Sequence, residues 1–104
     1  MQLVNIFCGL DTNGADVNAK QIALNLAAKH FPTGHTVFDT LGRYSGQVGI
    51  IDEPSICIQV LSPSDEISRN ELNHAVNLFC DAYKFDANQE SVLVTWQEIE
   101  AAFV

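Results

Sequence analysis

The chain has few basic residues, and this shortage limits the partners that it can bind. It contains 5 lysines and arginines against 13 aspartates and glutamates, so its formal net charge is −8. A surface of this charge repels phosphate backbones and anionic lipid headgroups. We therefore expect no nucleic acid and no membrane as a partner. The charge favours a cationic ligand or a basic protein, or it serves solubility alone.

Cysteine is also scarce, and its placement argues against metal and redox motifs. Cys8, Cys57 and Cys80 are odd in number and widely spaced, so there is no C-x-x-C pair. This excludes a zinc knuckle and a thioredoxin motif, and the three histidines lack metal-ligand spacing on one element. The sequence also lacks a P-loop, a dinucleotide-binding loop and a G-x-S-x-G turn. We expect no metal and no cofactor.

The N-terminal segment shows no targeting pattern. Residues 1–10 have no basic region and are too short for a signal peptide or a membrane span. Reduced thiols suit the cytoplasm, which is where we expect the protein. With 104 residues, 47% of them hydrophobic and 17% charged, the chain has an ordinary globular composition. We expect one domain over residues 1–104, because no linker, repeat or low-complexity segment divides it.

The first half of the chain predicts a strand, a helix and a second strand. Residues 2–8 alternate with apolar side chains on both faces, as in a central strand. Asp16 can cap a helix, and Pro32 ends that helix near Phe31. Residues 36–41 (TVFDTL) are rich in strand-forming side chains.

The second half predicts two more strands and a longer helix. Residues 55–61 (SICIQVL) form an apolar strand, and Ser68 to Glu71 match a capping box at the start of a helix over about residues 69–84. Residues 91–96 (SVLVTW) form the last clear strand. Residues 97–104 are ambiguous between a short helix and a continued strand, of which we favour the strand.

The resulting order, βαββαβ, predicts an α+β ferredoxin-like fold. Right-handed crossovers place both helices on one face of a four-stranded antiparallel sheet. Phe7 and Phe38 contribute apolar side chains to both faces of the sheet, so a monomer would expose an apolar patch. We therefore expect another subunit to cover it.

Residues 42–53 (GRYSGQVGIIDE) are the segment best suited to chemistry. Their three glycines permit either a long hairpin loop or two strand extensions around a short one. Arg43 and Tyr44 lie between the glycines, and Asp52 and Glu53 come directly before a buried strand. Polar residues at a junction of loop and strand can line a pocket. The alternative is a hairpin tip with solvated acids.

A second polar cluster precedes the last strand. Glu90, next to Gln89, could bind an ammonium group or transfer a proton. An acid in this position is more often part of the solvated surface.

Two motifs resemble those of a family of short bacterial proteins of unknown function. Phe31 to Val37 match F-P-x-G-x-T-V, and Gln89 to Leu93 match Q-E-S-V-L. The likeness covers nearly the whole chain and implies a fold but no chemistry. Members of that family are typically exported, whereas we expect no export signal here.

A more distant resemblance links the chain to the phage S-adenosylmethionine lyases, long called hydrolases. Their G-x-Y turn is matched from Gly42 to Tyr44, and their acid before a V-x-V-type strand is matched by Glu53. Their Gln-containing entry to a V-L-V strand is matched by residues 88–94. The resemblance implies a homotrimer of ferredoxin-like subunits with S-adenosylmethionine, or a related nucleotide, bound between them.

Carried over position by position, this resemblance implies that Tyr44 and Glu53 are the catalytic pair. The substrate-binding residues that it implies are Gly42, Arg43, Ser55, Gln89 and Glu90. In such a lyase the carboxylate of the substrate displaces the sulfonium, giving homoserine lactone and methylthioadenosine. The enzyme has to fold and desolvate the substrate, and it need not supply a nucleophile.

Three functions remain open on these residues. The first is the lyase, or a relative that acts on a signal nucleotide derived from S-adenosylmethionine. The second is a non-catalytic small-molecule sensor or sponge, like the PII-type trimers, with residues 42–53 as a lid. The third is an interaction module whose acidic face masks a basic protein.

Overall fold

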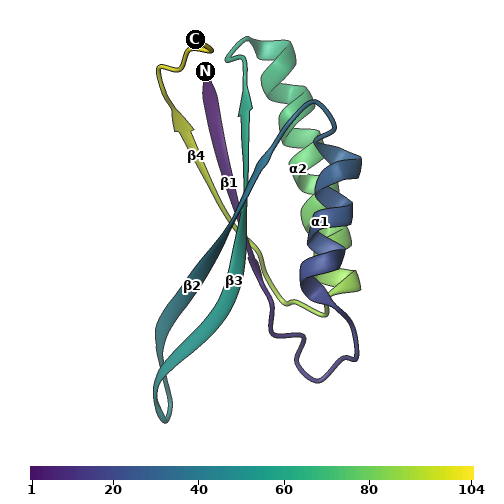
Figure 1. The fold of residues 1–104 in the computed structure, drawn as a ribbon, viewed down its shortest axis with the longest axis vertical. Coiled ribbons are helices and arrows are strands. Elements are labelled where there is room, and N and C mark those ends of the chain that lie inside the picture. The colour runs from purple at the N-terminus through teal and green to yellow at the C-terminus, as the bar shows by residue number, and fades with distance from the viewer.

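Two helices cover one face of a four-stranded antiparallel sheet (Figure 1). The computed structural model describes all 104 residues. The strand order is β2-β3-β1-β4, which confirms the expected ferredoxin-like fold. The elements are β1 Gln2–Gly9, α1 Ala19–His30, β2 Thr36–Gly46, β3 Gly49–Ser62, α2 Glu66–Asp86 and β4 Leu93–Glu98.

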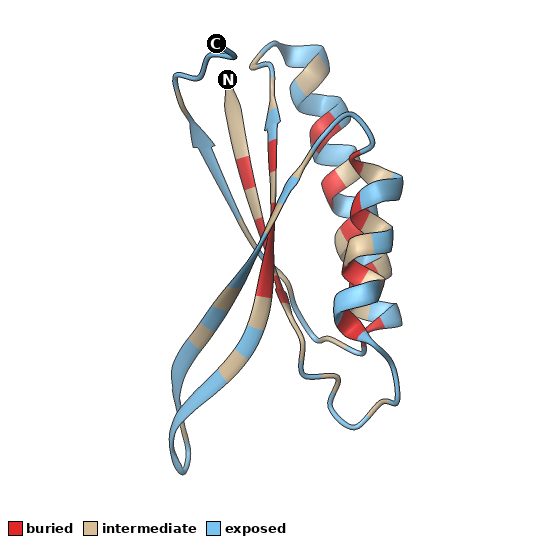
Figure 2. Cartoon of the chain, in the orientation of Figure 1, coloured by how far each residue is buried: buried red, intermediate tan, exposed pale blue.

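The core lies between the helices and the two central strands. Alternate side chains of β1 and β3 point toward the helices, and the pair Ile6 and Ile58 lies at the centre of this layer, fully buried. The alanines of α1 let this helix approach closely, whereas α2 contributes large side chains. Figure 2 shows these buried positions on the facing sides of both layers. The buried helix residues are Ala19, Ala23, Ala27, Leu72, Val76, Phe79 and Tyr83.

Both helices begin at a different residue from the one that the sequence predicts. The side chain of Asn18, not of Asp16, accepts the Gln21 N–H at the start of α1, at 3.1 Å. At the start of α2, Asp65 accepts both the backbone N–H and the hydroxyl of Ser68, so the predicted capping box at Ser68 is wrong. These bonds lower the pKa of Asp65. Each helix start offers two residues that favour caps; α1 uses the later one, Asn18, and α2 uses the earlier one, Asp65.

The segment of residues 42–53 forms two strand extensions. Pairing of β1 with β3 stops at Gly9 and Ser55, whereas β2 and β3 stay paired as far as Gly46 and Gly49. Residues 42–53 are therefore a two-stranded ribbon that projects beyond the helices (Figure 1), here called the arm. Glu53 lies inside β3, and not at the junction of loop and strand that the sequence suggests.

The last strand is shorter than expected. β4 ends at Glu98, and residues 99–104 have no regular structure, so a strand through Val104 was the wrong expectation. The backbone N–H of Ile99 donates to the carbonyl of Met1, and the two termini lie at the end of the sheet away from the arm (Figure 1). Neither helix combines the length and the apolarity that crossing a bilayer requires.

The sheet face away from the helices, here called the open face, has no covering layer in the chain. It carries the side chains that alternate with the core positions, and several of them are apolar and at least partly exposed. The larger apolar side chains on it are Leu3, Phe7, Phe38, Tyr44, Ile51, Leu61 and Leu93.

Candidate functional site

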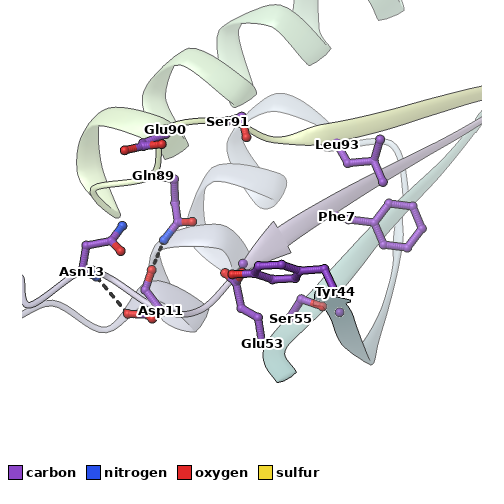
Figure 3. A pocket seen from close by; sticks show the side chains of 12 residues that line it. Phe7, Asp11, Asn13, Tyr44, Glu53, Ser55, Gln89, Glu90, Ser91 and Leu93 are labelled. Atoms are coloured by element: carbon purple, nitrogen blue, oxygen red, sulfur yellow. Dashed lines mark hydrogen bonds between the residues drawn. The ribbon is translucent and has the colours of Figure 1, made fainter. Parts of the chain in front are cut away.

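A pocket of about 500 Å³ lies where β1 ends and the arm begins. Four segments far apart in the sequence meet there: the end of β1 with the loop after it, β2, β3, and the entry to β4 (Figure 3). Twelve residues line it: Phe7, Gly9, Asp11, Asn13, Gly42, Tyr44, Glu53, Ser55, Gln89, Glu90, Ser91 and Leu93.

The pairing of the arm determines which of its side chains face this pocket. Gly42 lies directly opposite Glu53, and Tyr44 lies one step further along the same face. Since neighbouring residues of a strand point to opposite faces, Ser55 joins them while Ile56 points into the core. This pairing places a phenol, a carboxylate and a hydroxyl on one face of the paired strands β2 and β3.

Gly9 makes room for the carboxylate of Glu53. A Cβ built on Gly9 would overlap Glu53 Oε1, and it would also lie 3.1 Å from Gln89 Oε1. Gly42, on the opposite side of Glu53, likewise has no side chain. The Glu53 carboxylate therefore occupies space that the missing side chain of Gly9 leaves open, and none of the chain's ion pairs involves it.

Tyr44 and two neighbours supply the apolar part of the pocket. Tyr44 is 52% exposed as a residue, and its ring extends from β2 toward the Glu53 side chain (Figure 3). Phe7 and Leu93 are paired across β1 and β4 on the same open face. An apolar group and a cation bound next to it could both contact these surfaces, because aromatic faces attract cations.

Hydrogen bonds tie together the two loops at the other side of the pocket. Gln89 Nε2 donates to the Asp11 carbonyl, and Asn13 Nδ2 donates to the Asn88 carbonyl at 3.0 Å. Asn88 Nδ2 in turn donates a hydrogen bond to the Thr12 carbonyl, also at 3.0 Å. Asn13 and Asn88 both adopt positive φ, of 53° and 54°, which asparagine tolerates better than most residues. These bonds hold Asp11 and Gln89 at the pocket wall.

The charge of the pocket is entirely negative. Asp11, Glu53 and Glu90 line it, and no lysine, arginine or histidine does. Such a lining suits a ligand that carries an ammonium or a sulfonium group, because carboxylates stabilise cations and repel anions. The chain has no group of three or more His, Cys, Asp or Glu side chains placed to hold a metal ion.

Six of the seven predicted site residues line this pocket, and Arg43 does not. The Arg43 side chain lies on the other face of the arm, where its Nε donates to Asp52 Oδ1 at 2.7 Å. That the other six bind or act on a ligand stays a prediction. The lining residues that the sequence did not predict as site residues are Phe7, Gly9, Asp11, Asn13, Ser91 and Leu93.

The three cysteine thiols of the chain lie outside the pocket. Cys8 points into the core, where burial raises its pKa to about 12. Burial also raises the pKa of Cys57, whose thiol donates to Asn5 Oδ1 at 3.6 Å. Tyr83 lies beneath Gly9, donates its hydroxyl hydrogen to the Gly9 carbonyl, and has a pKa raised by burial. The pocket therefore offers groups that bind and orient, and no thiol nucleophile.

The sequence matches a known family along nearly its full length. The model of the family described as "Protein of unknown function (DUF3574)" matches residues 5–103. No curated protein sequence matches the chain.

Solved structures with a similar fold include a phage enzyme. A phage SAM lyase in complex with S-methyl-5'-thioadenosine is similar with a TM-score of 0.68 and 20% identity, covering 93% of this chain and 80% of that one. A phage SAM lyase in its apo state is similar with a TM-score of 0.68 and 21% identity, covering 92% of this chain and 78% of that one. A DUF3240 family protein from Shewanella baltica OS155 is similar with a TM-score of 0.57 and 10% identity, covering 99% of this chain and 93% of that one. At these levels of sequence identity, the similarity shows that the proteins share a fold and shows nothing beyond that.

Proposed function

The chain belongs to the DUF3574 family of proteins of unknown function, and we propose that it binds S-adenosylmethionine in the pocket at the base of the arm and cleaves it as a lyase. The observation that carries this proposal is the lining of the pocket, in which three carboxylates and a tyrosine are present and every basic side chain is absent. The fold shared with the phage SAM lyase supports it. We also propose a cytoplasmic location, because the three cysteines are free thiols and reduced thiols suit that compartment.

The proposed reaction needs no proton transfer. A carboxylate oxygen of the substrate forms a bond to the γ-carbon while the bond from that carbon to sulfur breaks, and the bonding pair stays on sulfur. The products are methylthioadenosine and homoserine lactone, which keeps its ammonium group, so atoms and charge balance. Orientation of reacting groups alone can contribute about 7–11 kcal/mol to such a step. A pocket that binds and orients is therefore sufficient.

The two predicted catalytic residues have different parts in this reaction. The ammonium group stays charged from substrate to product, whereas the sulfonium loses its charge as the bond breaks. A carboxylate next to the sulfonium would stabilise the substrate more than the transition state and would slow the reaction. We therefore assign Glu53 to the ammonium group and the Tyr44 ring, which attracts a cation more weakly than a carboxylate does, to the sulfonium side.

The other lining residues complete the binding surface in this proposal. Gly42 lines the pocket from β2 and Ser55 from β3, and Gln89 and Glu90 line it from the loop before β4. Gln89 already donates to the Asp11 carbonyl, so its contribution is to fix the wall. Glu90 takes part in no ion pair of the chain and provides further negative charge.

A homotrimer is part of the proposal. An isolated two-stranded ribbon is marginally stable in water, and the arm has no third strand beside it. The open face also carries apolar side chains that the chain leaves uncovered, such as Phe38, which is 42% exposed. Neighbouring copies packed on this face would support the arm and close the pocket over the substrate.

The test is to incubate the purified protein with S-adenosylmethionine and to measure methylthioadenosine and homoserine lactone. We expect both products in equal amounts, and we expect Glu53→Gln to reduce their rate strongly. Asp52→Asn is the matched control, because it makes the same change of charge on the other face of the same strand. Absence of products from a folded trimer would rule out the lyase.

A second function, binding without turnover, is favoured by one observation. No histidine, thiol or basic side chain lines the pocket, so every lining group can act in binding alone. In that case S-adenosylmethionine would be recovered unchanged from the protein, and Glu53→Gln would weaken its binding without altering any turnover.

A further inference from the structure

The substrate's carboxylate finds no ionic partner in the pocket. The twelve lining residues include no lysine, arginine or histidine. The N-termini of the helices do not line the pocket either, although such a terminus can bind a carboxylate. Every formal charge that this chain presents to the pocket is thus negative.

A second copy of the chain could add little positive charge. The chain has five lysines and arginines in all, and a homo-oligomer contains no others. Four of them pair with acids of their own chain: Lys20 with Asp39, Arg43 with Asp52, Arg69 with Glu98, and Lys84 with Asp81. The fifth, Lys29, lies in the last turn of α1, and α1 covers the sheet face away from the pocket.

We propose that the site recognises the cationic groups and the nucleoside of its ligand and leaves the carboxylate unpaired. This inference rests on the proposed function and specifies its substrate class: sulfonium nucleosides, selected by positive charge and not as amino acids. An arginine or lysine next to the carboxylate would strengthen binding of the amino acid part. Its absence removes the ionic means of requiring that part.

The unpaired carboxylate is also the group that has to react. An ion pair with a protein cation would stabilise its charge in the bound substrate, and that charge is lost as the new bond to carbon forms. Such a pair would therefore favour the ground state over the transition state. A pocket without cations leaves the carboxylate free to attack the γ-carbon.

Two analogues separate charge from the amino acid group. Decarboxylated S-adenosylmethionine keeps the sulfonium and the ammonium but has no carboxylate, so its net charge rises by one unit. It should bind at least as tightly as S-adenosylmethionine, inhibit competitively and yield no lactone. S-Adenosylhomocysteine keeps both charges of the amino acid but has no sulfonium charge, and it should bind about tenfold or more weakly.

The experiment measures the dissociation constants of all three compounds by calorimetry, with methylthioadenosine formation followed in parallel. Binding of the decarboxylated compound more than tenfold weaker than that of S-adenosylmethionine overturns the inference, even if the lyase activity is present. If the decarboxylated compound binds tightly but S-adenosylmethionine is not cleaved, the inference stands and the lyase fails. If none of the three binds, both fail.

A charge introduced into the pocket provides an independent test. Ser91 is an exposed lining residue to which no role is assigned, so Ser91→Lys places a cation at the wall. It should improve the affinity for S-adenosylmethionine relative to the decarboxylated compound by several fold and should lower the rate of cleavage. Asn77→Lys, at an exposed position of α2 outside both the pocket and the open face, is the control and should change neither quantity. An unchanged affinity ratio in Ser91→Lys contradicts the inference.

Discussion

The carboxylate of Glu53 on β3 lies against Gly9 at the end of β1, in space that any side chain at position 9 would occupy. The two residues are 44 positions apart in the sequence, and β1 stops pairing with β3 at Ser55, two residues after Glu53 in the chain. The missing side chain at Gly9 therefore determines where the carboxylate can rest. This contact gives a direct way to move Glu53 without replacing it.

Gly9→Ala should reduce activity nearly as much as Glu53→Gln. The new Cβ would overlap Glu53 Oε1, so the carboxylate would have to turn away from its position in the pocket. Gly9 does not have a positive φ, so alanine is compatible with the backbone there. The rate of methylthioadenosine formation and the melting temperature should be measured together. Full activity in a folded Gly9→Ala protein would show that this position of the carboxylate is not needed.

Tyr83→Phe should lower the stability of the protein, because it removes a hydrogen bond to the backbone of Gly9, a lining residue of the pocket. The change removes the hydroxyl that donates to the Gly9 carbonyl but keeps the ring that stacks on Phe79 at 6.1 Å. Loss of one buried hydrogen bond typically costs about 1 kcal/mol, which lowers the melting temperature of a domain of this size by about 4–8 °C. Thermal melting measures the effect, and an unchanged melting temperature would mean that the bond contributes nothing.

Arg43→Ala should leave the affinity for S-adenosylmethionine within about twofold of the original. The sequence assigns this residue to substrate binding, but the structure turns its guanidinium away from the pocket and pairs it with Asp52. Both partners are well exposed, so the pair should contribute at most about 1 kcal/mol to stability. Calorimetric titration is the measurement. A loss of affinity above tenfold would mean that Arg43 reaches a site on a neighbouring copy.

The case of Arg43 shows how far the sequence could predict the site. Once residues 42–53 form strands, alternation puts Tyr44 and Glu53 on one face and Arg43 on the other, but the three glycines left a loop equally open. The order of elements was predictable because apolar alternation and helical spacing are local patterns. Asp11 was missed because Gln89, which contacts it, comes 78 residues later and only the folded chain brings the two together.

Glu98→Gln should make stability less sensitive to acid. Glu98 accepts a hydrogen bond from the Ser64 hydroxyl at 2.7 Å, and the charges of the N-terminus and Arg69 lower its pKa further below the ordinary 4.5. A carboxyl with a lowered pKa in the folded state stabilises the fold above its unfolded pKa, and this contribution is lost as the pH falls through the folded value. Melting temperatures between pH 7 and pH 3 should therefore fall less in Glu98→Gln than in the original protein. Parallel curves would contradict this role.

Phe38→Lys should dissociate the proposed trimer and abolish activity without unfolding the subunit. Phe38 lies on the open face opposite Cys57 and is partly exposed, so a lysine there can reach water in a monomer but would be buried between copies. Phe85→Lys is the matched control, because Phe85 is 88% exposed on α2, outside the open face, and its replacement should leave the assembly intact. Light scattering after size-exclusion chromatography gives the mass, and circular dichroism confirms the fold. If the original chain is an active monomer, the open face needs no partner and the pocket works within a single subunit.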